Sequence, residues 1–340
     1  MNRFQRIALT AFICVEILIF VGAAVRATGS GLGCPDWPFC YGCWIPPTSA
    51  ENIDFTKLDL EKFRAKAARH GRDPATITQE TLMAEFDPVA TWVEYFNRLT
   101  SLPVGISITV LLCASIGQWR ERRPGVFFAS FAAFALVVVN AWLGARVVYS
   151  GLKPGTITLH MALAILLQCV LVYVIWKGTA RPWNIAPAAE RIRKVWRWAL
   201  LLFVLVVTEG VMGSQVRELT DELAMQHLGQ SRASWVGELE QTTVYLVHRS
   251  YSWLILGACL WFAVRARAVL GRLGWLERGI VALVLAQMVL GIILSHYGIM
   301  KSVQILHIGL SSLLVSGLFL WLLAGRGEVV FGSGITPCES

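Results

Sequence analysis

Residues 7–25 read IALTAFICVEILIFVGAAV, an apolar run long enough to form a helix that crosses a lipid bilayer. Its one charged side chain is that of Glu16. Arg3 and Arg6 precede the run as in a signal peptide, but the run is longer than a signal-peptide core, and Arg26 stands where a cleavage site would be expected. We therefore expect this segment to be retained as a transmembrane helix.

Seven further runs of this kind follow along the chain. The eight expected spans are residues 7–25, 89–117, 126–147, 156–176, 196–216, 241–264, 279–295 and 302–323. The composition agrees, because 56% of the 340 residues are hydrophobic and only 15% are charged, too few to cover the surface of a soluble protein. The sequence therefore predicts an all-α integral membrane protein with eight transmembrane helices, and it excludes a disordered, coiled-coil or collagen-like chain.

The positive charges indicate topology and no nucleic-acid partner. The net charge is +8, but the 30 lysine and arginine residues are spread over short stretches between apolar runs and form no basic domain. More than half of them lie in connections on one side of the membrane, so both termini are predicted to be cytoplasmic. The long loop 27–88 and the segment 214–240 are then outside, and the polar part 54–84 is expected to form one or two short surface helices.

Four short motifs occur once in each half of the chain. They are GAAVR at 22–26 and GSQVR at 213–217, EYFNR at 94–98 and YLVHR at 245–249, WLGA at 142–145 and VLGI at 289–292, and TLH at 158–160 and ILH at 305–307. Such a repeat predicts two four-helix bundles with the same orientation in the membrane. We expect the N-terminal half to span 1–176, including the outer loop, and the C-terminal half to span 177–340.

Three of the four equivalent positions near the outer helix ends hold histidine: His160, His248 and His307. An ionisable side chain inside a membrane helix is a functional candidate, although each one alone could be structural. His248 and His307 could face each other across the C-terminal bundle, and two opposed imidazoles suit the axial ligands of a haem iron. A zinc site would need four ligands, and no cysteine or carboxylate repeats beside these histidines.

The fourth equivalent position is Asn97, so His160 has no imidazole partner in its own half. A neutral amide is a poor iron ligand, and this site should hold iron from one side. Glu94 lies one helical turn before Asn97 on the same face, where its carboxylate could manage protons or water. Alternatively, Glu94 simply pairs with Arg98 at the i, i+4 spacing.

Four arginines mark the outer helix ends: Arg26, Arg98, Arg217 and Arg249. Arginine at such a place could pair with the propionates of a haem. The other reading is that these side chains extend to the lipid headgroups.

Residues 22–40, GAAVRATGSGLGCPDWPFC, resemble the first-helix and loop signature of the bacterial, eight-helix haem A synthases. Glu94, Asn97 and Arg98 stand in the place of that family's E-x-x-H-R motif, and the resemblance covers all eight expected helices. It implies a membrane-bound oxidoreductase. Members oxidise the C8 methyl group of haem O to a formyl group through a hydroxylated intermediate, which gives haem A for terminal oxidases.

The resemblance also implies roles for the candidate residues. His248 and His307 would hold a haem b cofactor, and His160 the iron of the substrate haem. Glu94 falls on the family's functionally important carboxylate, and the substrate-haem site would further include Asn97, Arg98 and Arg26, with Arg217 and Arg249 left for propionates. Cys34 and Cys40 match a pair of loop cysteines that form a disulfide outside the cytoplasm, for which the extra Cys43 could compete.

Asn97 is the main departure from the family motif, and we expect the protein to work with a single histidine at the substrate site. Expected partners are haem O, the farnesyltransferase that makes it (haem O synthase) and the lipid bilayer. A homo-oligomer is also open. The lack of a mitochondrial presequence favours a bacterial plasma (inner) membrane. Two other functions stay open: a di-haem b-type membrane electron carrier, and a non-catalytic haem carrier or assembly protein. No flavin, nicotinamide or iron–sulfur motif identifies an electron acceptor.

Overall fold

A computed structural model describes residues 1–34, 36–69, 73–149, 155–185, 189–227, 230–298 and 300–326. In these residues all regular structure is helical apart from an isolated bridge between Cys40 and Cys43. Eight helices are long and apolar enough to cross a membrane. They are α1 (Arg3–Thr28), α4 (Pro88–Arg120), α5 (Pro124–Tyr149), α6 (Thr156–Lys177), α7 (Ala189–Gln226), α9 (Thr243–Leu270), α10 (Trp275–His296) and α11 (Lys301–Ala324). The predicted all-helical, multi-pass architecture is confirmed.

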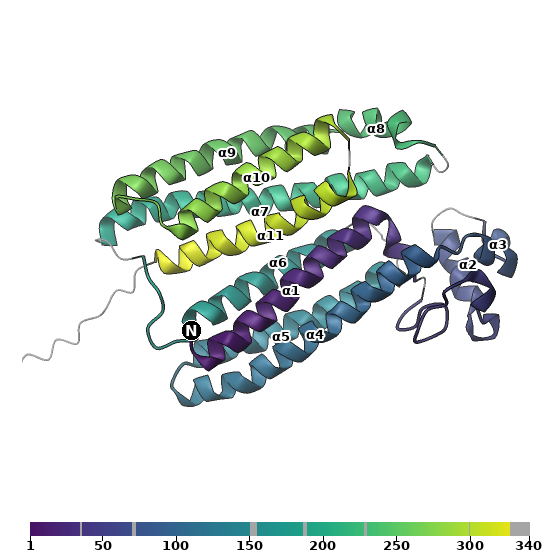
Figure 1. The fold of residues 1–340 in the computed structure, drawn as a ribbon, viewed down its shortest axis with the longest axis horizontal. Coiled ribbons are helices and arrows are strands. Elements are labelled where there is room, and N and C mark those ends of the chain that lie inside the picture. The colour runs from purple at the N-terminus through teal and green to yellow at the C-terminus, as the bar shows by residue number, and fades with distance from the viewer. Residues whose placement is uncertain are drawn as a thin grey trace, which may run out of the picture.

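Short helices occupy the two longer connections. Between α1 and α4 lie η1 (Ser30–Leu32), η2 (Ala50–Asn52), η3 (Phe55–Lys57), α2 (Leu60–Arg69), η4 (Pro74–Thr76) and α3 (Gln79–Ala84). The short helices expected in 54–84 are thus confirmed, and they lie at the same end of the long helices as α8 (Arg232–Gln241) (Figure 1).

The segment 214–240, expected to lie outside the membrane, is mostly helical where the structure describes it. Helix α7 continues ten residues past the predicted end at Val216, to Gln226, and α8 follows. The added residues, RELTDELAMQ, are mostly strong helix formers but polar. Hydropathy therefore locates where the apolar span ends and misses where the helix ends.

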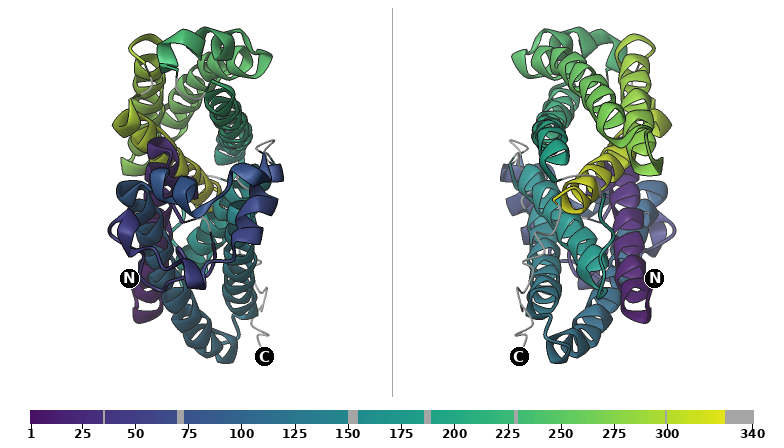
Figure 2. Two further views of the ribbon diagram at one scale, coloured as in Figure 1. Left: turned by 90° about the vertical axis from the view of Figure 1, so that its right-hand side faces the viewer. Right: turned by 90° about the vertical axis from the view of Figure 1, so that its left-hand side faces the viewer.

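The long helices pack as two groups of four, which the end-on views separate (Figure 2). Helices α1, α4, α5 and α6 share one hydrophobic core, and α7, α9, α10 and α11 contribute most of a second. Fully buried side chains at these centres include Ile108, Leu111 and Leu171 in the first core and Leu202, Phe262 and Leu318 in the second. Helix α11 also packs on α1 and α6, so it joins the two groups.

A close approach and a buried polar cluster mark the junction of α1, α6 and α11. Gly309 allows the approach, because a Cβ there would lie 2.2 Å from Cε1 of Phe20. Nearby, the buried carboxylate of Glu16 accepts a hydrogen bond from Ser312 Oγ at 2.7 Å and another from Gln168 Nε2. Buried polar groups need such partners, so this cluster fixes how the three helices meet.

Candidate functional site

The four positions that the repeat equates each face a glycine on the preceding membrane helix. A Cβ atom placed on that glycine would lie 3.9 Å from Asn97 Oδ1 at Gly22, 3.6 Å from His160 Cε1 at Gly144, 3.3 Å from His248 Cε1 at Gly213 and 3.8 Å from His307 Cε1 at Gly291. The helix pairs that carry them, α1–α4, α5–α6, α7–α9 and α10–α11, are in extensive contact. A Cβ would crowd the ring at Gly213 and would make an ordinary van der Waals contact at the other three glycines, so the four positions share one arrangement and Gly213 makes the tightest approach.

The second group of helices carries two of the histidines. His248 on α9 and His307 on α11 belong to the same group of helices, and each ring lies against a glycine of the preceding membrane helix. In the described chain, neither ring makes a hydrogen bond through its buried Nδ1, although Glu209 Oε1 lies 3.2 Å from that of His248. Buried polar atoms without a partner are uncommon, so these two rings are candidates for a functional role.

A bare metal ion does not suit these side chains. Within the described ranges, no three or more His, Cys, Asp and Glu side chains cluster as a metal site would require. Haem iron needs only one or two protein ligands because the macrocycle supplies the others. The paired imidazoles of His248 and His307 therefore fit a haem better than a free ion.

His160 in the first group has different surroundings. With the Asn140 amide oriented to satisfy both of its polar atoms, its nitrogen donates to the His160 carbonyl at 3.1 Å and to Nδ1 at 3.2 Å. The guanidinium of Arg26 lies close to this turn of α6, because its Nη1 is 3.3 Å from the sulfur of Met161, the residue after His160. His160 thus lies beside a cation and a neutral amide.

The N-terminal turn that carries His160 is held from α7. Glu218 accepts hydrogen bonds from the backbone N–H of Gly155 at 3.3 Å and of Thr158 at 3.2 Å, and from the Thr158 hydroxyl at 2.7 Å. A carboxylate at the start of a helix satisfies its free N–H groups. Although α7 belongs to the other group, it therefore positions the first turn of α6.

Glu94 and Arg98 form the i, i+4 pair that the sequence left open as an alternative. Arg98 Nε donates to Glu94 Oε1 at 3.2 Å, and Glu94 is only 5% exposed. The other Arg98 donors bind loop carbonyls, those of Cys34 at 2.9 Å and of Asp36 and Phe39 at 2.8 Å each. Sequence reasoning missed this anchoring role, since no local spacing links Arg98 to carbonyls some 60 residues away.

The loop so anchored is closed by the Cys34–Cys40 disulfide that the family resemblance implied, with 4.8 Å between the Cα atoms. The chain after the disulfide is held by Asp36. Its carboxylate accepts hydrogen bonds from the backbone N–H groups of Tyr41 and Gly42 at 2.7 Å each. Burial and the nearby Asp36 charge raise the pKa of Tyr41 to about 12. Cys43 is a free thiol here, although its backbone pairs with that of Cys40.

Arg26 and Arg217, predicted as equivalents, meet at one carboxylate. Asp221 on α7 lies 2.6 Å from Arg217 Nη2 and 3.4 Å from Arg26 Nη2. Arg217 Nη2 also donates to the Arg26 carbonyl, while its Nε is buried with no hydrogen-bond partner in the described chain. Asp221 was missed because α7 was expected to end at Val216; its i+4 spacing from Arg217 was the available signal. Arg249 is exposed.

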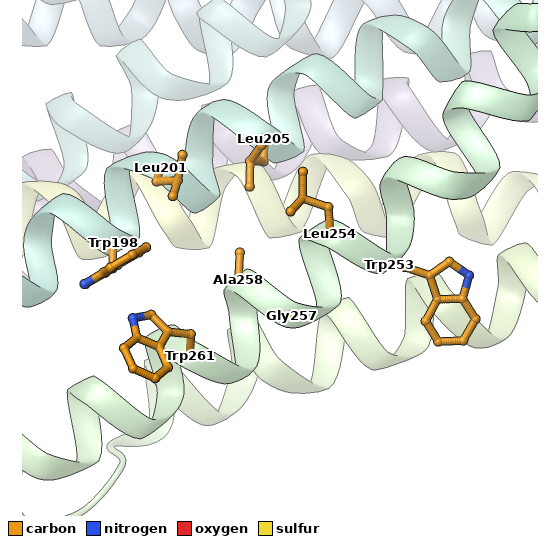
Figure 3. Close-up of a pocket in the computed structure, with 8 residues that line it drawn as sticks. All are labelled: Trp198, Leu201, Leu205, Trp253, Leu254, Gly257, Ala258 and Trp261. Carbon is orange, nitrogen blue, oxygen red and sulfur yellow. The ribbon is translucent and has the colours of Figure 1, made fainter.

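An apolar groove of about 390 Å³ lies on α7 and α9, apart from these residues (Figure 3). It is lined by Trp198, Leu201, Leu205, Trp253, Leu254, Gly257, Ala258 and Trp261. Its lining lacks any acid, base or nucleophile, so we assign no chemistry to it.

Comparisons with known proteins all point to one family. Residues 5–319 match the COX15-CtaA family, described as cytochrome oxidase assembly protein. The chain is 26% identical to a haem A synthase of Rhizorhabdus wittichii over 96% of this chain and 94% of that one. It is also 26% identical to the haem A synthases of Sphingopyxis alaskensis, over 89% of this chain and 86% of the relative, and of Nitrosomonas eutropha, over 77% and 76%.

Proposed function

Since the chain belongs to the COX15-CtaA family of cytochrome oxidase assembly proteins, we propose that it is a haem A synthase. The reaction is oxidation of the C8 methyl group of haem O to a formyl group through a hydroxylated intermediate, and the product serves terminal oxidases. The observation that carries the proposal is the recurrence of a histidine against a glycine in three of four equivalent helix pairs. Relatives called haem A synthase that align over most of the chain support it.

We further propose that residues 1–176 and 177–340 are repeated halves with the same orientation. Both termini are then cytoplasmic, and the membrane is the bacterial inner membrane. The equivalent glycine contacts of Asn97, His160, His248 and His307 support the repeat. The excess of lysine and arginine in the connections of one side supports the orientation.

In the C-terminal half, His248 and His307 would hold a haem b cofactor. Their side chains fit that group, because imidazole is a ligand of haem iron and each ring lies against a glycine of the preceding membrane helix. When bound, haem b would supply a one-electron centre that takes electrons from the substrate side. Arg217, with its unpartnered Nε, and the exposed Arg249 would bind propionates.

In the N-terminal half, haem O would bind with His160 as its one strong protein ligand. Asn97 takes the position of the second histidine in the repeat, and its neutral amide would be a poor ligand for the substrate iron. Arg26, close to the turn that carries His160, would neutralise a propionate. Glu94 is buried and oriented by Arg98, which suits a carboxylate that accepts protons released during the oxidation.

The test is haem analysis of the purified protein, produced together with the farnesyltransferase that makes haem O. Extracted haems are separated by chromatography and identified by mass. Haem A or its alcohol precursor beside haem B is the expected result. Two b haems per chain and no oxidised product would instead support the electron carrier, and haem O bound but unchanged would support the carrier or assembly protein.

A His160→Ala variant, produced in the same way, tests whether the oxidised haem comes from the N-terminal site. If His160 holds the substrate, this variant loses the oxidised haem and keeps haem B. The same extract from membranes without the protein fixes the background level of haem A.

A further inference from the structure

A polar side chain accompanies each of the three histidines, four residues before the glycine that the histidine faces. These residues are Asn140 before Gly144, Glu209 before Gly213 and Gln287 before Gly291. At the fourth position, before Gly22, the residue is Leu18, and there the facing residue is Asn97. Residues four apart lie on one helix face, so each polar group lies next to the glycine on the face that meets the histidine.

The three polar groups contact their histidines differently. Glu209 Oε1 lies 3.2 Å from Nδ1 of His248. Gln287 Nε2 donates to the carbonyl of His307 at 2.9 Å and so binds its backbone. The Asn140 amide nitrogen lies 3.2 Å from Nδ1 of His160 in the orientation that satisfies it.

These contacts bear on which imidazole nitrogen carries the proton. A histidine that binds iron through Nε2 must keep its proton on Nδ1, and a partner at Nδ1 fixes this arrangement. An ionised carboxylate can only accept, whereas an amide can donate or accept. Glu209 therefore favours the iron-binding form of His248.

The unused hydrogen-bonding capacity around Glu209 agrees with this role. Its Oε1 already accepts the Ser252 hydroxyl at 2.9 Å, which fixes the carboxylate beside the ring. Its Oε2 and the Nδ1 of His248 are both buried, and neither forms a hydrogen bond with the described residues. A small rotation of the ring or carboxylate would satisfy both groups at once.

We propose that Glu209 is the positioning residue that makes the C-terminal haem permanent: it fixes the iron-binding form of His248 and lowers the reduction potential of the haem. A hydrogen-bonded carboxylate makes the imidazole a stronger electron donor and so stabilises ferric iron. The inference rests on the proposed haem b site.

The test compares wild type with Glu209→Gln and Glu209→Leu in the full-length protein purified with its haem. The readouts are the midpoint potential, by optical redox titration, and the low-spin ferric electron paramagnetic resonance spectrum. We expect the potential to rise in Glu209→Gln and further in Glu209→Leu, with a shift of the largest g value. The matched control is Gln287→Leu, which removes the equivalent side chain beside His307 and should leave both readouts close to wild type.

The near-isosteric Glu209→Gln variant decides the question if Glu209→Leu does not fold. Unchanged potential and spectrum in Glu209→Gln, with full haem content, would overturn the proposal, as would an equal shift in Gln287→Leu. Loss of haem from Glu209→Gln but not from Gln287→Leu would support it. A wild-type protein without haem B would instead refute the proposed C-terminal haem site itself, before any variant is compared.

Discussion

The guanidinium of Arg98 donates a hydrogen bond to the carbonyl of Cys34 at 2.9 Å, across 64 residues of sequence. The same side chain binds two more loop carbonyls and the carboxylate of Glu94. One arginine thus connects the disulfide loop to the buried carboxylate next to Asn97. The loop motif and the helix motif that carry the family resemblance are, in the folded protein, a single hydrogen-bonded unit.

Replacing Arg98 by lysine should detach the loop while keeping a positive charge near Glu94. A lysine ammonium cannot reproduce the fork of donors that binds three carbonyls. We expect Cys34 and Cys40 to be reduced and labelled several times faster at a low concentration of reductant, as measured by mass spectrometry of the labelled peptides. Arg249→Lys changes the exposed equivalent in the second half, and equal acceleration in that variant would contradict the anchoring role.

The free thiol of Cys43 gives a second test of the loop. Cys43 should react with a maleimide without reductant, because Cys34 and Cys40 are paired with each other. Cys43→Ser should leave stability unchanged, whereas Cys40→Ser should lower it by about 2 kcal/mol through lost loop closure. Peptide mapping that finds Cys43 in the disulfide of the wild-type protein would refute this pairing.

Asn97→His restores the residue of the family motif at the position that faces Gly22. If Asn97 stands opposite His160 at the substrate iron, the variant loaded with haem O should become six-coordinate and low-spin, and conversion to haem A should continue. The absorption spectrum of the loaded protein shows the change. An unaltered spectrum would mean that residue 97 does not approach the iron.

Variants of Glu16 test whether its hydrogen bonds stabilise the junction of α1, α6 and α11. Glu16→Leu removes the acceptor of Gln168 and Ser312, and an unsatisfied buried donor costs about 1–3 kcal/mol. We expect the thermal midpoint in detergent to fall clearly in Glu16→Leu and less in Glu16→Gln, which keeps one carbonyl oxygen. Equal midpoints for the two variants would show that only side-chain volume matters at this junction.

Hydropathy predicted the membrane helices because burial in lipid selects long apolar runs. Seven of the eight expected spans lie within observed helices, and the remaining one, 241–264, begins two residues before α9. Hydropathy failed after Val216, where α7 continues with polar residues outside the apolar span. The repeat selected His160, His248 and His307 because equivalent positions share one environment.

The contacts of the site were less predictable. The roles of Arg98, Asp221 and Glu209 depend on which helices lie side by side and how each is rotated. Sequence spacing indicates neighbours on one helix, as for Arg217 and Asp221, but not neighbours from different helices, as for Glu209 and His248.

The most direct test of the account is the haem content of two single variants beside wild type, each produced with haem O. We expect His307→Ala to lose haem B. We expect His160→Ala to keep haem B but to contain no haem A or alcohol precursor. Undiminished haem A in His160→Ala, or loss of haem B from that variant, would contradict the division into a substrate half and a cofactor half.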